Sequence, residues 1–261
     1  MQQNSGNTEY RTFAGRRALV TGASSGLGAH FAGLLARGDI DQLFVAARSV
    51  NRLKATADAC QALGAKSVTP IAMDVTNVDS VSAGFAEIER AGGIDLLVNN
   101  VGMTVQKPAL DCSVDDFDGV MNTNIRGAWL CAQAAGRLMS KEAGGDIVNI
   151  ASILGLRVAN AVTAYAISKA GVIHMTKALA VEWARFDIRV NALAPGYFET
   201  DLNRSFFASD PGQAMIKRIP MRRLGTLADL DSPFTLLASG ASRYLTGAIL
   251  TVDGGHHINS V

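Results

Sequence analysis

The stretch Thr21-Gly-Ala-Ser-Ser-Gly-Leu-Gly28 decides the fold, because it joins an apolar run at residues 17–21 to a helical pattern at residues 26–37. Its glycines, Gly22, Gly26 and Gly28, are spaced GxxxGxG. Glycine permits a tight turn and a close approach of the backbone to a ligand. The helix start beyond the turn offers unpaired N–H groups and a positive dipole end, which suit phosphate. The stretch therefore predicts a pyrophosphate-binding turn, against the alternative of a tight turn without a ligand.

Short apolar segments alternate with helical patterns along the rest of the chain. We predict strands at residues 17–21, 42–47, 67–73, 95–98, 146–150, 188–193 and 248–252. Helices are predicted at residues 26–37, 51–63, 78–91, 114–140, 163–185 and 228–239. Such alternation is typical of a mostly parallel sheet with helices on both faces and a ligand at the carboxyl ends of the strands. The fold class is therefore α/β, with a single doubly wound Rossmann domain of seven strands at residues 15–261, after a flexible tail at residues 1–14.

Composition and charge exclude several classes of protein. The chain has 261 residues, a net charge of +1 and 48% hydrophobic residues, so it can bury a large core and has no basic excess for nucleic acid or an anionic membrane. Residues 1–11 are polar and lack the apolar centre of a signal peptide, and no apolar run approaches the roughly 20 residues of a membrane helix. Three cysteines without paired spacing predict reduced thiols in a cytoplasmic protein. Four histidines without ligand spacing predict no metal site.

The end of the second predicted strand indicates which nucleotide binds. In a dinucleotide fold this position faces the adenine ribose, where an acid accepts the 2′-hydroxyl and an arginine accommodates a 2′-phosphate. The strand ends Ala46-Ala47-Arg48-Ser49, with no acid. A planar, always charged guanidinium suits a phosphate dianion, so we expect NADP(H) in preference to NAD(H), unless Arg48 is a surface arginine that binds nothing. Asp74, after the third strand, is placed either to meet the adenine amine or to serve as a turn acid.

Four polar residues predict the chemistry. Tyr165 and Lys169 lie four residues apart on one predicted helix and therefore share a face. Ser152 ends the fifth predicted strand, and Asn124 lies inside a long helical segment. A nearby ammonium favours the phenolate, so we expect Lys169 to lower the pKa of Tyr165 from the value of about 10 of a free tyrosine. Ser152 can hydrogen-bond a substrate oxygen. Taken alone, Ser152 is equally well a strand-end cap and Asn124 a polar residue that bends a helix.

The order of these residues resembles that of a known family. The chain is similar to classical short-chain dehydrogenases/reductases from about residue 15 to residue 255, because it carries their motifs in sequence: the glycine turn, Asn99-Asn100-Val101-Gly102, Asn124, Ser152, Tyr165 with Lys169, and Pro195-Gly196. The resemblance implies an oxidoreductase that moves a hydride between a nicotinamide cofactor and a carbonyl or alcohol. It implies that Tyr165 transfers the proton, that Lys169 binds the nicotinamide ribose, and that Asn124 keeps a water linking Lys169 to solvent.

The resemblance also implies a cofactor site assembled from the ends of several strands. Its residues are Gly22, Ser24, Ser25, Gly26, Leu27, Gly28, Arg48, Asp74, Val75, Asn100, Val101, Gly102, Tyr165, Lys169, Pro195, Gly196, Phe198 and Thr200. Asn99 is expected to lie against the adenosine as well. Members of the family are mostly homotetramers or homodimers that pair two long helices, here at residues 114–140 and 163–185, and we expect the same assembly.

The substrate is predicted less sharply than the cofactor. The segment at residues 196–220 is the expected lid, and it contains Phe198, Phe206, Phe207, Met215 and Ile216. A partly apolar lid fits an apolar or bulky ketone, although the same residues can equally pack the lid onto the body. Arg157, just after Ser152, is placed to meet an anionic substrate group or to be a solvated loop arginine.

These features favour a ketone or 3-oxoacyl-type reductase that acts on a small-molecule carbonyl or secondary alcohol. One alternative is an NAD-dependent alcohol, sugar or hydroxysteroid dehydrogenase. Another is a catalytically silent binding protein, which is disfavoured because Tyr165 and Lys169 are both present, and function rests on such site residues rather than on the fold.

Overall fold

The computed structural model describes residues 12–199 and 204–259, and a seven-stranded sheet lies at their centre. The strands are β1 (Arg17–Thr21), β2 (Gln42–Ala47), β3 (Val68–Ala72), β4 (Leu96–Asn99), β5 (Gly145–Ile150), β6 (Ile188–Pro195) and β7 (Ile249–Val252). They run in the order β3-β2-β1-β4-β5-β6-β7, and every neighbouring pair is parallel. The predicted doubly wound sheet is confirmed.

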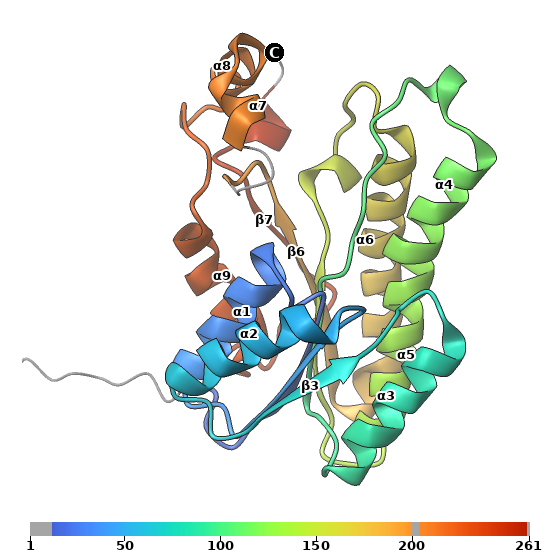
Figure 1. The fold of residues 1–261 in the computed structure, drawn as a ribbon, viewed down its shortest axis with the longest axis vertical. Coiled ribbons are helices and arrows are strands. Elements are labelled where there is room, and N and C mark those ends of the chain that lie inside the picture. The colour runs from blue at the N-terminus through green and yellow to red at the C-terminus, as the bar shows by residue number, and fades with distance from the viewer. Residues whose placement is uncertain (1–11, 200–203, 260–261) are drawn as a thin grey trace, which may run out of the picture.

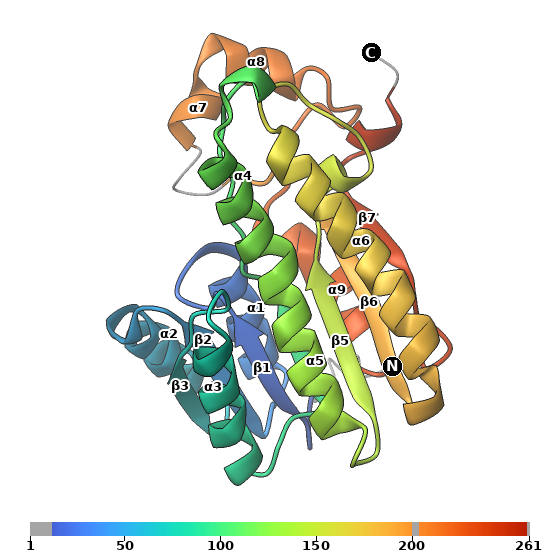
Figure 2. The same ribbon diagram turned by 90° about the vertical axis from the view of Figure 1, so that its right-hand side faces the viewer.

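Helices cover both faces of this sheet, as Figures 1 and 2 show. The helices on one face are α1 (Gly26–Arg37), α2 (Val50–Ala62) and α9 (Asp231–Ala238). The other face carries α3 (Val78–Arg90), α4 (Val114–Met121), α5 (Gly127–Met139) and α6 (Thr163–Trp183). Two short helices, α7 (Arg204–Ala208) and α8 (Asp210–Ile216), lie beyond the carboxyl ends of the strands.

The sheet is buried from both sides, which explains its apolar strands. All of the four residues Leu43, Phe44, Val45 and Ala46 in β2 are buried, with alternate side chains entering opposite core clusters. On one face, Phe31 of α1 stacks on Phe234 of α9, with ring centroids 4.4 Å apart. Strands covered on both faces lack the polar alternation of a half-exposed sheet.

The strand order reverses between β1 and β4, and this reversal positions the site. From β1 the chain moves outward to β3, and then crosses to β4 on the other side of β1. The loops after β1 and β4 therefore diverge and leave a crevice at the carboxyl ends of the strands. The Thr21 hydroxyl joins the two strand ends, because it donates to the Val98 carbonyl at 3.3 Å and accepts from the Asn100 N–H at 3.0 Å.

Two features depart from the predicted elements. The helix predicted at residues 114–140 is interrupted by a π-helical segment, Asn122–Arg126, between α4 and α5. Such segments are rare and recur at functional sites. Phe13 is buried in the core and its N–H donates to the Gly38 carbonyl, so the packed chain includes a residue that was expected in the tail. Residues 1–11 of that tail lie outside the described residues.

Within residues 12–199 and 204–259, no helix combines the length and the apolar character that a bilayer span requires.

Candidate active site

The turn between β1 and α1 requires its glycines for steric reasons. Gly22 and Gly26 have φ angles of +66° and +55°, which residues with a side chain rarely adopt. A Cβ atom on Gly28 would lie 2.3 Å from the Gly22 carbonyl oxygen and 2.5 Å from Nδ2 of Asn100. That amide in turn donates to the Thr21 and Gly22 carbonyls at 3.1 and 3.3 Å. The turn is thus packed directly against the end of β4, as a pyrophosphate-binding turn must be.

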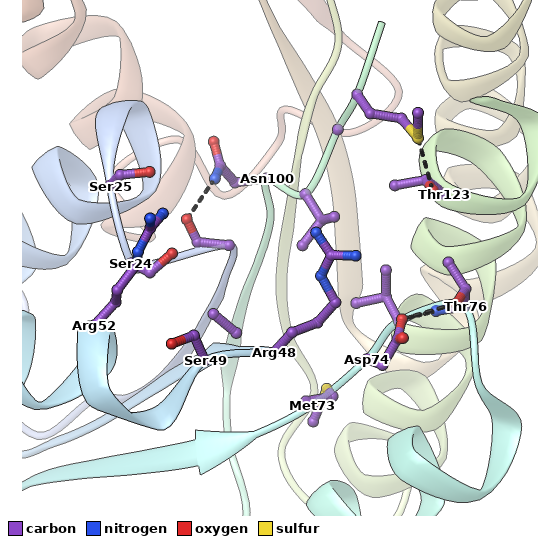
Figure 3. Close-up of a pocket in the computed structure, with 16 residues that line it drawn as sticks. Ser24, Ser25, Arg48, Ser49, Arg52, Met73, Asp74, Thr76, Asn100 and Thr123 are labelled. Carbon is purple, nitrogen blue, oxygen red and sulfur yellow. Dashed lines mark hydrogen bonds between the residues drawn. The ribbon is translucent and has the colours of Figure 1, made fainter. Parts of the chain in front are cut away.

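A cavity of about 410 Å³ opens beside this turn, at the carboxyl ends of β1 to β4. Figure 3 shows polar side chains around it that follow β1, β2, β3 and β4. The predicted cofactor residues that line it are Gly22, Ser24, Ser25, Arg48, Asp74, Val75, Asn100, Val101 and Gly102. The donor set, the glycine turn and the two arginines, Arg48 and Arg52, fit an adenosine with a phosphorylated ribose and a pyrophosphate.

Asp74 has the turn role that was weighed for it, and its contact with the adenine amine stays a prediction. Its carboxylate accepts from the N–H and the hydroxyl of Thr76 at 2.9 and 2.8 Å, as a turn acid does. It also lines the cavity. Its pKa is lowered chiefly by the backbone bond from Thr76, with further contributions from the Thr76 hydroxyl and the Arg48 charge. Asp74 is therefore an anion at neutral pH and a hydrogen-bond acceptor within the nucleotide cavity.

A second cavity, of about 720 Å³, adjoins the first at Asn100, Gly102 and Met103. Ser152, Tyr165 and Lys169 line it, so the structure brings three of the four predicted catalytic residues together. Ser152 follows β5, and the other two lie on the first turns of α6. The predicted cofactor residues Leu27, Pro195 and Gly196 line the same cavity.

Lys169 is the most buried charge of the site. Its side chain is 4% exposed, and Nζ donates to the Ile150 carbonyl at 2.8 Å. Burial lowers the pKa of Lys169 from 10.5 to about 8, because the ammonium loses hydration that one carbonyl replaces only in part. Nζ lies 5.7 Å from the centroid of the Tyr165 ring. The ammonium thus lies within cation–π distance of the Tyr165 ring.

The acidity of Tyr165 differs from the sequence-based expectation. Its pKa is raised, chiefly because burial disfavours the phenolate, and a smaller raising effect comes from Tyr197. A hydrogen bond with Ser152 lowers the pKa in part. The expectation that Lys169 lowers the pKa of Tyr165 is wrong for the protein by itself, because the Lys169 ammonium donates to the Ile150 carbonyl instead. Tyr165 is therefore a neutral phenol at neutral pH, poised to donate a proton.

Asn124 lies in the π-helical segment and does not line either cavity. Its side chain accepts from the Met103 N–H at 2.8 Å, donates to the Met103 carbonyl at 2.8 Å, and donates to the Ser168 hydroxyl at 2.9 Å. It thereby fixes the loop after β4 to the helix that carries Tyr165 and Lys169. Asn124 is a positioning residue, and its expected role in holding a water stays a prediction.

Several expected contacts are not made. The Phe198 ring packs over Gly225 and lines neither cavity, and Thr200 lies outside the described residues. Asn99 does not reach the nucleotide cavity; its amide donates to the Asn149 side chain inside the fold, because it ends a strand buried on both sides. Arg157 is half-buried, donates to the His256 carbonyl and does not line the substrate cavity.

Seven residues that line the nucleotide cavity were not among the predicted cofactor residues: Ala47, Ser49, Arg52, Met73, Thr76, Met103 and Thr123. Arg52 lies four residues after Arg48, on the first turn of α2, and Met103 directly follows the Asn99–Gly102 motif. The spacing of Arg52 was a usable signal, because residues at the end of a strand and in the first turn of the next helix surround the same crevice.

Comparison with known proteins agrees with this geometry. Residues 22–257 match the family model described as enoyl-(acyl carrier protein) reductase. Gluconate 5-dehydrogenase of Gluconobacter oxydans is 36% identical over 246 residues, which are 94% of this chain and 95% of that protein.

Two crystal structures extend the likeness to three dimensions. A short-chain type dehydrogenase/reductase from Mycobacterium marinum superimposes with a TM-score of 0.88 at 37% identity, covering 95% of this chain and 98% of the other. A gluconate 5-dehydrogenase from Burkholderia cenocepacia, in complex with NADP and tartrate, gives a TM-score of 0.89 at 34% identity, with coverages of 95% and 97%. This likeness agrees with the order of the sheet, with the glycine turn and with the site formed by Ser152, Tyr165 and Lys169. The chain therefore belongs to the short-chain dehydrogenase/reductase family of oxidoreductases.

Proposed function

We propose that the protein is an NADP(H)-dependent oxidoreductase that reduces bulky, apolar ketones or oxidises the corresponding secondary alcohols. The observation that carries this proposal is the 720 Å³ cavity, which has Ser152, Tyr165 and Lys169 on one wall. The remaining wall is mostly apolar, and includes Leu154, Val162, Phe206, Phe207 and Met215. The wall also carries Thr104, Gln106, Asn160 and Tyr197, and the same volume has to receive the nicotinamide beside Pro195 and Gly196. The apolar side chains around the rest of it suit an apolar ligand held by one oxygen. The relative crystallised with NADP supports the choice of cofactor.

The three polar residues have separate roles in this reaction. A bound nicotinamide supplies or accepts the hydride at the carbonyl carbon. Ser152 donates a hydrogen bond to the carbonyl oxygen and holds it beside Tyr165. The Tyr165 hydroxyl, kept protonated by its burial, gives its proton to that oxygen. Lys169 places a positive charge near the phenolate that remains, which favours the transfer.

A second candidate is a dehydrogenase of sugar acids, because two of the relatives are gluconate 5-dehydrogenases. A carboxylate substrate calls for a cationic partner. Among the described residues that line the cavity, Lys169 alone has a cationic side chain, and it already donates to the Ile150 carbonyl. The lining therefore favours an uncharged substrate over an aldonate.

Initial rates separate the two candidates. We expect the highest kcat/KM with NADPH and apolar cyclic or aryl ketones, lower values with 3-oxoacyl thioesters, and the lowest with a 5-keto-aldonate. Tyr165→Phe should lower kcat by about 10²- to 10⁴-fold and leave NADPH binding nearly unchanged. Turnover confined to the keto-aldonate, or near-normal activity of Tyr165→Phe, would contradict the proposal.

The assembly and the location are part of the same proposal. Trp129 of α5 and Ile167 and Val181 of α6 are apolar and exposed, and they lie on the two helices that were expected to pair. We infer that this face joins two copies in a homodimer or homotetramer, since an exposed apolar face of this kind marks an interface. The three free cysteines support a cytoplasmic location, where thiols stay reduced.

A further inference from the structure

Tyr197 is a second phenol in the cavity that holds Tyr165. It follows Gly196, just beyond the end of β6, and lines the 720 Å³ cavity. Its backbone is held in place, because the Gly225 N–H donates to the Tyr197 carbonyl at 2.9 Å. The transfer of hydride and proton described above uses Tyr165 and leaves Tyr197 without a role.

Two aromatic rings from distant segments hold the ring of Tyr197. Phe207 of α7 packs against it edge to face, with ring centroids 5.9 Å apart and an angle of 70° between the planes. The ring of His256, which follows β7, lies 5.4 Å from it between centroids. Such contacts restrict the plane of a tyrosine ring, and with it the place of the hydroxyl. Tyr197 therefore presents its hydroxyl in a preorganised position.

The Tyr197 hydroxyl has no hydrogen-bond partner among the described residues. The residue is half-buried, and burial raises its pKa, although the Arg157 charge lowers it in part. The hydroxyl is thus a neutral donor at neutral pH. Tyrosine hydroxyls that are withdrawn from water usually have a partner, so this one is available to a ligand of the cavity.

The other polar side chains of the substrate wall differ from Tyr197 in their exposure. Thr104, Gln106 and Asn160 line the same cavity and are exposed, so water can satisfy their polar groups. Tyr197 is the half-buried donor of this set. A ligand that fills the cavity without an acceptor near Tyr197 leaves that hydroxyl unpaired, which costs binding free energy.

The Tyr197 hydroxyl also lies near the reacting groups. The charge that Tyr197 would carry as a phenolate raises the pKa of Tyr165, an effect that requires the two phenol oxygens to be within electrostatic range. In the proposed reaction Ser152 and Tyr165 hold the carbonyl oxygen. The Tyr197 hydroxyl is therefore placed to reach a different atom of the same substrate, close to the reacting carbonyl.

We propose that the Tyr197 hydroxyl donates a hydrogen bond to a second, uncharged oxygen of the substrate, so that the enzyme selects ketones with a further carbonyl or ether oxygen near the reacting one. The proposal rests on the reduction of apolar ketones put forward above, and it adds one attachment point to the apolar ligand. It makes Tyr197 a specificity-determining residue, because its bond discriminates between ketones that differ by one oxygen.

Two ketones with one skeleton test this bond. Diphenylethanedione carries a second oxygen where 1,2-diphenylethanone has a methylene group. Tyr197→Phe removes the hydroxyl and keeps the ring that contacts Phe207 and His256. With NADPH, we expect this variant to lower kcat/KM for the dione by about tenfold, and to leave kcat/KM for the monoketone within about twofold of the wild type. Each ketone is compared with its own wild-type value, so the difference in their intrinsic reactivity cancels.

The loss with the dione should appear in KM, with kcat nearly unchanged, because the bond is present both before and during hydride transfer. NADPH affinity, followed by fluorescence, should not change. Tyr244→Phe is the matched control, because it removes the same hydroxyl from a fully exposed tyrosine, and it should behave as the wild type with both ketones.

The outcomes separate this proposal from the function on which it rests. If Tyr197→Phe affects both ketones equally, affects neither, or weakens NADPH binding, the role of Tyr197 is overturned and the proposed function stands. If the wild type reduces neither ketone, the proposed function is overturned, and the role of Tyr197 with it.

Discussion

Replacing Lys169 by methionine should change how the stability of the protein depends on pH. The pKa of Lys169 is lowered from 10.5 to about 8 by burial, so the folded state binds this proton more weakly than the unfolded state. A difference of this size corresponds to about 3 kcal/mol of stability lost while the lysine is charged in both states, which is the case at pH 7.

The sign and the pH window follow from these two pKa values. Between about pH 8 and 10.5 the unfolded state carries the proton and the folded state does not, so the free energy of unfolding contributed by Lys169 rises with pH. At pH 9.5 the cost has fallen to about 1.5 kcal/mol. Relative to Lys169→Met, the wild type should therefore gain about 2 kcal/mol of stability between pH 7 and pH 9.5.

Urea denaturation at both pH values, at one protein concentration, measures this difference. The lost bond to the Ile150 carbonyl affects the variant similarly at both pH values, so it cancels in the comparison. Lys177→Met, which replaces an exposed lysine on the same helix, is the matched control and should show the pH dependence of the wild type. A constant stability difference between the wild type and Lys169→Met from pH 7 to 9.5 would refute the reasoning.

Two further predictions concern the cofactor turn and the assembly. Gly28→Ala places a Cβ 2.3 Å from the Gly22 carbonyl oxygen, so it should cost about 1–3 kcal/mol of stability, measured by thermal melting, and abolish NADPH binding, measured by NADPH fluorescence. The control Gly119→Ala lies in α4 with nothing within 4 Å, and should leave both readouts unchanged or raise the melting temperature. Equal behaviour of the two variants would show that the turn is not tightly packed. Val181→Glu puts a charge on an 82% exposed position of α6, and should lower the mass measured by light scattering toward that of a single chain; an unchanged mass would place the interface elsewhere.

Local sequence patterns were sufficient for the elements and for much of the site. The alternation of buried strands and helices predicted all the strands of the sheet, because a parallel sheet leaves an unmistakable apolar run in each strand. The glycine spacing predicted the nucleotide-binding turn, because a tight turn requires glycine. The four-residue separation of Tyr165 and Lys169 predicted the catalytic pair, because residues four apart lie on one helix face.

Other features depended on contacts between distant segments. Asn99 is bonded within the fold by Asn149, 50 residues away, and Phe198 is packed over Gly225, so neither contacts the nucleotide cavity as expected. The π-helical segment around Asn124 could not be predicted either, because the side chain of Asn124 bonds with Met103 and Ser168, which are distant in the sequence. No local pattern reports which remote residue will occupy a side chain's polar groups.

The sequence by itself determined that this chain has a glycine turn, a parallel sheet and a tyrosine with a lysine on one helix face. Only the tertiary structure decided the acidities of that pair. Burial lowers the pKa of Lys169 and raises that of Tyr165, whereas the proximity of the two side chains alone predicted a more acidic tyrosine. The physical reason is that spacing along a helix sets which groups meet, but the loss of solvent around them depends on β5, the loop after β4, α7 and α8, which surround the same cavity.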